Sequence, residues 1–344
     1  MKDTRFSISI VVPVYNSEAI LPALIQRLLS VSAGHAAHSE IILVNDGSRD
    51  GSWQVICEQA RQHPGIRGIN LMRNFGQHNA LLCGIREAKY EVIVTLDDDL
   101  QHPPEEILKL LEKLSEGHDV VYGTPEKEQH GHWRDMASRI TKLGLQYTMG
   151  AATARHVSAF RVFRAQLRDA FARYQGSFVS IDVLLTWATT RFSFVPVAHH
   201  PRLAGRSNYT FRRLAIHALN MITGFTTLPL ELASMLGLAC TGFGLVVLVY
   251  VLGRYLLQGS SVPGFPFLAS IIAIFSGVQL FALGIIGEYL ARIHFRTMDH
   301  PAYAVRSTHP PQRPERDGPD TTLSPPAQAR AVSDTEDHRG PVQP

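Results

Sequence analysis

The sequence predicts an α/β protein with a mostly parallel sheet in its first part and helices suited to a membrane in its second. Between residues 6 and 122, short runs rich in β-branched residues alternate with helical patterns, an order that produces a parallel sheet covered on both faces. Polar motifs follow the strand-like runs, at the ends where such sheets bind ligands. Two later segments, 232–252 and 267–287, contain no charged residue. We therefore expect a ligand-binding domain followed by a membrane anchor.

The expected elements of the sheet domain follow one another in regular order. Strands are predicted at residues 7–13, 40–45, 67–71, 91–96 and 119–122. Helical patterns cover residues 18–29, 52–61, 80–88 and 104–116. A helix between each pair of strands is the connection that parallel neighbours need, which gives a Rossmann-like sheet.

Composition limits the classes of function. Of the 344 residues, 45% are hydrophobic and 18% are charged, a balance low in charge for a purely soluble protein. The formal charge of +3 and the lack of a dense Lys/Arg run argue against a nucleic-acid partner. Three scattered cysteines without a C-x-x-C pair indicate a reducing compartment and no zinc site. The N-terminus lacks the apolar core of a signal peptide, so we expect a cytoplasmic first domain.

The sequence Asp97-Asp98-Asp99 lies between an apolar strand-like run and a helical pattern opened by two prolines. In an extended segment Asp97 and Asp99 would share one face, while Asp98 would point elsewhere. Adjacent carboxylates raise each other's pKa unless a cation lies among them, and Mg²⁺ or Mn²⁺ prefers such oxygen ligands, usually shared with substrate phosphates. The alternative is a solvated acidic turn that caps the next helix. The flanking strand and helix and the other motifs favour the metal site.

Asn45-Asp46-Gly47-Ser48 follows the second predicted strand and has two interpretations. It could form only a turn with a helix cap. A buried aspartate there could also accept hydrogen bonds from a nucleobase or ribose, with the glycine letting the backbone come close. The chain has no G-x-G-x-x-G and no G-x-x-x-x-G-K-[ST], so neither a dinucleotide site nor a P-loop is indicated.

Several motifs taken together resemble a known family. They are Val-Pro-Val-Tyr-Asn at 12–16, Val-Asn-Asp-Gly-Ser at 44–48, Arg-Asn-Phe-Gly-Gln-His at 73–78, Leu-Asp-Asp-Asp-Leu-Gln-His-Pro-Pro-Glu at 96–105, Trp133-Arg134 with Ser138, Phe160-Arg161, and Gly205-Arg206-Ser207-Asn208-Tyr209. On these residues the chain resembles the polyisoprenyl-phosphate glycosyltransferases of glycosyltransferase family 2. The resemblance covers residues 8–303 and implies the GT-A fold and inverting transfer from a nucleotide sugar.

The resemblance also implies roles for particular residues. The nucleotide would be held by Tyr15 and Asp46, in a site that also contains Pro13, Arg73, Asn74, Gln77 and Asp98. The metal and the diphosphate would be held by Asp97, Asp99 and Gln101. The acceptor phosphate would lie near Arg134, Ser138, Arg202 and Ser207. The implied catalytic set is Asp97, Asp99, Arg134, Arg202 and Ser207.

The chain departs from the family's pattern in three places. Ser17 stands where the family commonly has glutamate, which follows here at Glu18. The family's Gly-x-Ser-Lys ends in Asn208. Many members carry an aspartate, proposed as a base, just before Phe-Arg, whereas residues 155–159 contain no carboxylate. The last departure leaves the catalytic base open.

A lipid phosphate acceptor can do without a protein base. The second pKa of a monophosphate is about 6, so at neutral pH it is largely a dianion and can attack without losing a proton. Arginine forks suit such an anion, and the candidates are Arg134 and Arg202, assisted by Ser207. Asp182 is the nearest downstream carboxylate that could act as a base, and for it we favour a capping or structural role.

The second half of the chain predicts attachment to a membrane. Residues 211–225 read as a basic amphipathic helix, and the two uncharged segments are each long enough to span about 30 Å of hydrocarbon. Arg212, Arg213, Arg292 and Arg296 flank the outer ends of the pair, against Arg254 in the connecting loop, which predicts a cytoplasmic catalytic domain. The predicted divisions are 1–210, catalytic; 211–229, interfacial helix; 230–292, transmembrane hairpin; and 293–344, cytoplasmic with a Pro-rich tail, disordered from Ser307.

The resemblance implies transfer of a sugar, from a UDP-sugar, to undecaprenyl phosphate at the cytoplasmic face of the inner membrane, for cell-envelope or lipopolysaccharide modification. We also expect contact with membrane lipid and a homo-oligomer. One alternative is a processive polysaccharide synthase, which usually carries Gln-x-x-Arg-Trp and more spans. The other is a catalytically silent, nucleotide-binding membrane scaffold, favoured only by the missing aspartate near Phe160 and opposed by the acidic triplet. His130, His132, His199 and His200 are interpreted as surface or boundary histidines.

Overall fold

The computed structural model describes residues 6–125, 156–176, 179–200, 228–258, 264–298 and 301–310. Its strands are β1 (Ser7–Val14), β2 (His38–Asn45), β3 (Ile66–Leu71), β4 (Val92–Thr95), β5 (Val120–Pro125), β6 (Arg161–Arg164), β7 (Phe192–Val197) and β8 (Val305–His309). Its α-helices are α1 (Leu21–His35), α2 (Ser52–Gln62), α3 (Gln77–Glu87), α4 (Ile107–Ser115), α7 (Ile181–Thr186), α9 (Leu228–Gln258) and α10 (Phe265–Thr297). Two 3₁₀ helices, η1 (Pro104–Glu106) and η2 (Ala165–Phe171), precede α4 and α7.

The strands form one sheet in the order β7-β5-β6-β4-β1-β2-β3-β8. β1 runs parallel to β2 and β4, β2 runs parallel to β3, and β5 runs parallel to β7. β6 is antiparallel to both of its neighbours, and β8 is antiparallel to β3. This mostly parallel sheet with helices between its strands confirms the predicted fold class.

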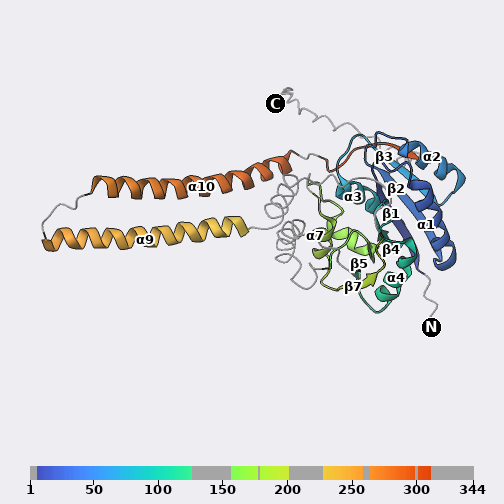
Figure 1. Ribbon diagram of the computed structural model, residues 1–344, viewed down its shortest axis with the longest axis horizontal. Coiled ribbons are helices and arrows are strands. Elements are labelled where there is room, and N and C mark those ends of the chain that lie inside the picture. The colour runs from blue at the N-terminus through green and yellow to red at the C-terminus, as the bar shows by residue number, and fades with distance from the viewer. Residues whose placement is uncertain are drawn as a thin grey trace, which may run out of the picture. The chain divides into compact units, whose positions relative to one another are not determined.

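Alternate residues of β1 serve the two faces of the sheet, as the pleat requires. Ile10 and Val12 pack on one face with α1, α2 and α4, whereas Val11 packs on the other face with α3 and α7. All three side chains are fully buried. The sheet domain therefore has an apolar core on each face, and in Figure 1 α1 and α3 lie to either side of β1.

Three strands were not predicted from the sequence. β6 begins and ends with arginine, β7 contains Pro196, and β8 reads Val-Arg-Ser-Thr-His, so none shows a clear alternation of apolar and polar residues. The prediction that the tail is disordered from Ser307 is wrong for residues 307–309, because the backbone of β8 pairs with β3. Residues 311–344 lie outside the described part of the chain.

Helices α9 and α10 contain both of the uncharged segments and lie side by side (Figure 1). Two stretches, Pro229–Arg254 and Ile274–Ala291, are long and apolar enough to cross a membrane, and neither is buried by the protein. The ring of Phe275 lies so close to Gly244 that a Cβ there would be 2.9 Å away. These features agree with the predicted hairpin.

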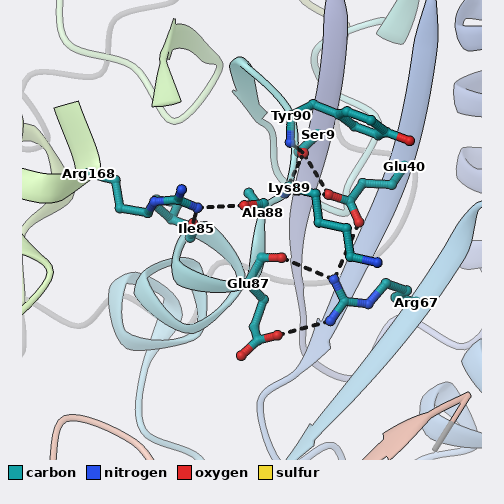
Figure 2. A network of polar contacts seen from close by, with 9 residues as sticks. All are labelled: Ser9, Glu40, Arg67, Ile85, Glu87, Ala88, Lys89, Tyr90 and Arg168. Carbon is teal, nitrogen blue, oxygen red and sulfur yellow. Dashed lines mark hydrogen bonds and ion pairs between the residues drawn. The ribbon is translucent and has the colours of Figure 1, made fainter. Parts of the chain in front are cut away.

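A network of polar contacts links the amino ends of β1, β2 and β3 (Figure 2). The buried carboxylate of Glu40 accepts hydrogen bonds from the Ser9 hydroxyl and the Lys89 backbone N–H, both at 2.7 Å. Arg67 lies 3.4 Å from Glu40 and donates to the carbonyl and the carboxylate of Glu87, at 3.0 and 2.9 Å. Arg67 thus pairs with carboxylates and also caps the carbonyl of Glu87, the last residue of α3.

Candidate functional site

The polar motifs meet at the opposite edge of the sheet, at the carboxyl ends of β1, β2, β3 and β4. Strand β1 lies between β2 and β4, so the order of the strands reverses there. In open α/β sheets, such a reversal leaves a crevice in which ligands bind. Tyr15 follows β1, Asp46 follows β2, and the acidic triplet follows β4, so three predicted motifs share this edge.

Asp98 joins the loop after β1 to the acidic triplet. Its carboxylate accepts a hydrogen bond from the Tyr15 backbone N–H at 3.1 Å and another from the Ser17 hydroxyl. Burial raises the pKa of Asp98, and the charge of Asp99 raises it further, while the bonds from Ser17 and Tyr15 oppose this. Ser17, the first departure from the family pattern, therefore holds the middle carboxylate, and Glu18 instead accepts from the Gly51 N–H at 2.9 Å.

The premise that the acidic triplet is extended is wrong. Strand β4 ends at Thr95, where its pairing with both neighbours stops, and Asp98 and Asp99 form a turn. Leu100 then adopts φ 56°, in the left-handed region, as the chain turns toward η1. Within the turn the three carboxylates make different contacts. Asp97 accepts from the Gln77 amide at the start of α3, and the buried Asp99 accepts from the Gln101 N–H at 3.1 Å.

The donor set of the turn fits a hard divalent cation. Asp97, Asp99 and Gln101 offer carboxylate and amide oxygens, and each carboxylate oxygen has more than one lone pair, so the bonds to Gln77 and the Gln101 N–H leave acceptor capacity. In the ranges that the structure describes, no group of three His, Cys, Asp or Glu residues is arranged to hold a metal. An ion at this turn would thus complete its shell with oxygens from a ligand or water.

Asp46 fixes the loop between β3 and α3. Its buried carboxylate accepts hydrogen bonds from the backbone N–H groups of Phe75 and Gly76, at 2.7 and 2.9 Å, and its carbonyl accepts from the Asn74 amide at 3.1 Å. Burial raises the pKa of Asp46, whereas these N–H groups and the charge of Arg73 lower it. Asp46 therefore anchors the loop after β3, which goes beyond the turn with a helix cap that the sequence allowed.

Gly47 permits the close approach behind this contact. It has φ 65°, and a Cβ at this position would lie 2.6 Å from backbone atoms of both Arg73 and Asn74. Because those atoms belong to the backbone, they could not move aside as a flexible side chain can. Only glycine fits here, and the loops after β2 and β3 are locked together.

Three residues of the predicted nucleotide site differ in how they face solvent. Tyr15 is 44% exposed. The Arg73 guanidinium is exposed too and lies 4.1 Å from the centre of the Phe75 ring. Pro13, by contrast, is buried within β1 beside Val44 of β2. Tyr15 and Arg73 thus offer an aromatic face and a cation to a ligand at this edge.

His102, which the sequence interpretation did not single out, lies beside the acidic turn and contacts His199. The His102 ring stacks on the Phe160 ring, with 5.3 Å between ring centres, and its centre lies 4.9 Å from that of the His199 ring. The pKa of His102 is lowered to about 4, mainly by burial and also by His199, while Asp99 opposes the shift. The His200 N–H also donates to the Gln101 carbonyl at 2.8 Å, so the segment after β7 packs against the turn. The signal for His102 was its place within the motif at 96–105.

Asp182 is engaged in a buried ion pair. Its carboxylate contacts the Arg161 guanidinium and accepts a hydrogen bond from the Tyr122 hydroxyl at 3.2 Å. Arg161 is 1% exposed and also donates to the Thr95 hydroxyl at 3.0 Å, at the last residue of β4. Burial and the adjacent carboxylate raise the pKa of Tyr122 well above its usual range. These contacts support the structural role predicted for Asp182.

The predicted acceptor residues lie outside the described residues. They are Arg134, Ser138, Arg202 and Ser207. The structure brings together Tyr15, Asp46, Arg73, Asn74, Gln77 and the acidic triplet with Gln101. The donor half of the predicted site is therefore assembled at one edge, and the acceptor half stays a prediction.

The chain is similar to a protein-family model, to named proteins of other organisms and to solved structures. The family model described as "Glycosyl transferase family 2" matches residues 9–174. Proteins of Salmonella choleraesuis and Salmonella paratyphi B named "Undecaprenyl-phosphate 4-deoxy-4-formamido-L-arabinose transferase" are 35% identical over 308 residues, which cover 89% of this chain and 94% of theirs. A solved mannosyltransferase of Pyrobaculum calidifontis, in complex with GDP-Man and Mn²⁺, matches 84% of this chain and 88% of its own at 17% identity and a TM-score of 0.47. Glucosyl-3-phosphoglycerate synthase of Mycobacterium tuberculosis matches 63% and 78% at 17% identity and a TM-score of 0.45.

Proposed function

Because the chain belongs to glycosyl transferase family 2, we propose that it transfers a sugar from a nucleotide-diphosphate sugar to undecaprenyl phosphate. The observation that carries this proposal is that hydrogen bonds join the loops after β1 and β3 to the acidic turn. Asp98 bonds to the loop after β1, and Asp97 bonds to Gln77 at the end of the loop after β3. A nucleotide held by these loops would have its diphosphate beside the carboxylates of the turn. The names of the Salmonella relatives support the lipid phosphate as acceptor.

The donor side of the reaction uses residues that the structure describes. A base can stack on the exposed Tyr15 ring, and Arg73 can pair with a phosphate. Asp46 has lone pairs left after its bonds to Phe75 and Gly76, so it can also accept from a base or ribose. We propose UDP as the nucleotide, as in the sequence interpretation.

Asp97, Asp99 and Gln101 would hold Mg²⁺ or Mn²⁺ against the diphosphate. When bound, the cation neutralises charge that develops on the leaving nucleotide. Gln77 orients the Asp97 carboxylate, and the Gln101 N–H orients Asp99. Because Asp98 is occupied by Tyr15 and Ser17, its contribution is to keep the turn against the loop after β1.

The acceptor side needs no protein base. A lipid phosphate dianion attacks the anomeric carbon directly, the bond to the diphosphate breaks, and the configuration inverts. Asp182 is committed to Arg161 and Tyr122, which supports a mechanism without it. Arg134 and Arg202, assisted by Ser207, would align the two anionic groups. The rate should therefore rise with pH through the acceptor's own second pKa, about 6, and then level off.

The membrane hairpin would bring the acceptor to the enzyme. Helices α9 and α10 expose apolar side chains such as Leu238 of α9 and Leu280 of α10, at 75% and 69%, as lipid-facing helices do. After α10 the chain pairs with the sheet domain again through β8, so a pair of crossings keeps both ends of the hairpin on one side. With the arginine distribution, this supports a multi-pass inner-membrane protein whose catalytic domain is cytoplasmic.

A donor screen tests the proposal. Purified full-length protein in lipid nanodiscs would be incubated with undecaprenyl phosphate, Mg²⁺ or Mn²⁺ and a panel of UDP-, GDP- and dTDP-sugars, and lipid products would be measured by mass spectrometry. We expect a glycosyl undecaprenyl phosphate from a UDP-sugar and none from the Asp99→Asn variant. Nucleotide binding without any lipid product across the panel would instead support the silent scaffold.

A further inference from the structure

After α10 the chain returns to the sheet domain and adds the outermost strand, β8, beside β3. Strand β8 pairs antiparallel with β3, with Asn70 opposite Ser307 and Leu71 opposite Val305. The register shifts between Asn70 and Leu71, at the carboxyl end of β3. This end leads directly into residues 73–77, which we name the donor loop. The segment that follows the hairpin therefore lies at the base of the donor loop.

Both backbone groups of Met72, the residue just before the donor loop, are bonded to the returning segment. The Met72 N–H donates to the Ala304 carbonyl at 2.9 Å. The Arg306 guanidinium donates to the Met72 carbonyl at 3.0 Å. The Met72 side chain itself is half exposed, so these backbone bonds, rather than packing, determine where the peptide lies. A charged donor on a carbonyl makes the stronger kind of hydrogen bond.

The far end of the donor loop is fixed separately. Asp46 accepts from the N–H groups of Phe75 and Gly76, and α3 begins at Gln77. Only Arg73 and Asn74 lie between this anchor and Met72. A short segment held at both ends has little conformational freedom, and releasing either end restores it. The position of Arg73 thus depends on the bonds at Met72.

The start of the returning segment is also docked on the domain. Ala302 is 5% exposed, and Tyr303 accepts a hydrogen bond from Arg86 of α3 at 3.4 Å. The Arg86 guanidinium also lies 5.6 Å from the centre of the Tyr303 ring. This contact holds the segment against the helix that ends the donor loop, so β8 has support besides its ladder with β3.

We propose that the backbone of the returning segment supports the donor loop and that Arg306 is a positioning residue, which acts on the nucleotide through this loop. Its effect on donor affinity rests on the proposed function, whereas its effect on the loop does not. Loss of the Arg306 side chain frees the Met72 carbonyl, lets the loop open, and misplaces Arg73 before the nucleotide arrives. Donor binding must then restore the order that Arg306 supplied.

The first experiment measures the loop without any ligand. Hydrogen exchange of the peptide that contains residues 72–77 would be followed by mass spectrometry on full-length protein in nanodiscs. Arg306→Ala should speed exchange of this peptide about fivefold, because one hydrogen bond of modest net strength is lost. Arg306→Lys should restore part of the protection. Ser307→Ala is the matched control, because this neighbouring side chain is exposed and β8 keeps its backbone ladder.

The second experiment measures catalysis on the same variants. Arg306→Ala should raise the KM for the nucleotide sugar about fivefold and leave kcat and the KM for undecaprenyl phosphate unchanged. Unchanged exchange at residues 72–77 would overturn the proposal, even if activity fell. If exchange rises but wild-type protein binds no nucleotide sugar, the loop contact stands and the proposed function fails.

A pair of truncations provides a check that does not depend on one side chain. A chain that ends at Pro311 keeps β8, and we expect wild-type exchange and donor KM. A chain that ends at Met298 keeps α10 but lacks β8, and we expect fast exchange at residues 72–77 and a donor KM raised at least as much as in Arg306→Ala. Equal donor KM values for the two truncations would contradict the proposal.

Discussion

The two ends of the sheet use the same kinds of side chain for different purposes. At the amino ends of the strands, Glu40 and Glu87 meet the cation Arg67, and the carboxylates and guanidinium satisfy one another (Figure 2). At the carboxyl ends, Asp46 and Asp98 accept hydrogen bonds from the backbone of loops. Carboxylates matched by cations contribute to stability, whereas carboxylates that hold loops arrange groups for a ligand. The two ends should therefore respond differently to mutation.

The acidic turn should show the largest effect. Asp97→Asn is expected to reduce turnover by about two to three orders of magnitude, because the metal loses a charged ligand and the leaving diphosphate loses neutralisation. Steady-state rates with saturating Mn²⁺ would measure this. The change in unfolding free energy should stay below about 1 kcal/mol, since the side chain is only partly buried and keeps its shape. A large loss of stability in Asp97→Asn would contradict the view that carboxylates at the carboxyl ends of the strands serve the ligand rather than stability.

At the amino end, Arg67→Met should lower the unfolding free energy by about 3 kcal/mol, because it leaves the buried Glu40 carboxylate without its cation. Chemical denaturation of the protein in detergent would measure it, with kcat/KM expected to remain near that of wild type below the unfolding transition. Arg27→Met is the matched control. Its ion pair with Glu105 has side chains 37% and 52% exposed, so its loss should cost less than about 1 kcal/mol.

Asp46→Asn should raise the KM for the donor about tenfold. One amide oxygen can still accept from Phe75 or Gly76, but the new NH₂ group faces the other backbone N–H and repels it. Initial rates at varied donor concentration would measure the change. An unaltered KM for the acceptor would serve as the internal control, and a rise in both values would show that the loop affects the whole site.

Ser17→Ala should have the smallest effect, a reduction of kcat/KM by about threefold to fivefold. The variant removes the hydroxyl that donates to Asp98 but leaves the bond from the Tyr15 N–H, so the turn is held by one contact rather than two. Ser115→Ala is the control, because that hydroxyl donates to a carbonyl in the last turn of α4, on the surface. If the two serine variants behave alike, Asp98 does not position the turn.

The sequence was sufficient for the class of the fold and for the donor motifs. The strands that continue directly into those motifs are apolar and β-branched, as in β1 and β2, so their pattern is clear. The strands that were missed depend on partners distant in the chain. Arg161 can be fully buried within β6 only because Asp182 and Thr95 satisfy its guanidinium, and no local pattern reveals those partners.

The details of the site depended on tertiary contacts as well. An alternating pattern predicts Asp97 and Asp99 on one face, but the strand stops at Thr95 because its neighbours stop pairing there. The role of Asp46 as an anchor for Phe75 and Gly76 likewise needs two loops brought together. Motifs therefore identified which residues meet, and the packing of the loops determined what each side chain contacts.

Nucleotide binding in the presence and absence of metal shows whether the acidic turn holds a cation against the diphosphate. Isothermal titration of UDP into full-length protein would be carried out with Mn²⁺ and with excess EDTA, for wild type and for Asp99→Asn. We expect Mn²⁺ to strengthen binding to wild type at least tenfold, Asp99→Asn to abolish this gain, and EDTA to abolish turnover. Equal affinity with and without metal, together with full activity in EDTA, would contradict a metal site at the acidic turn.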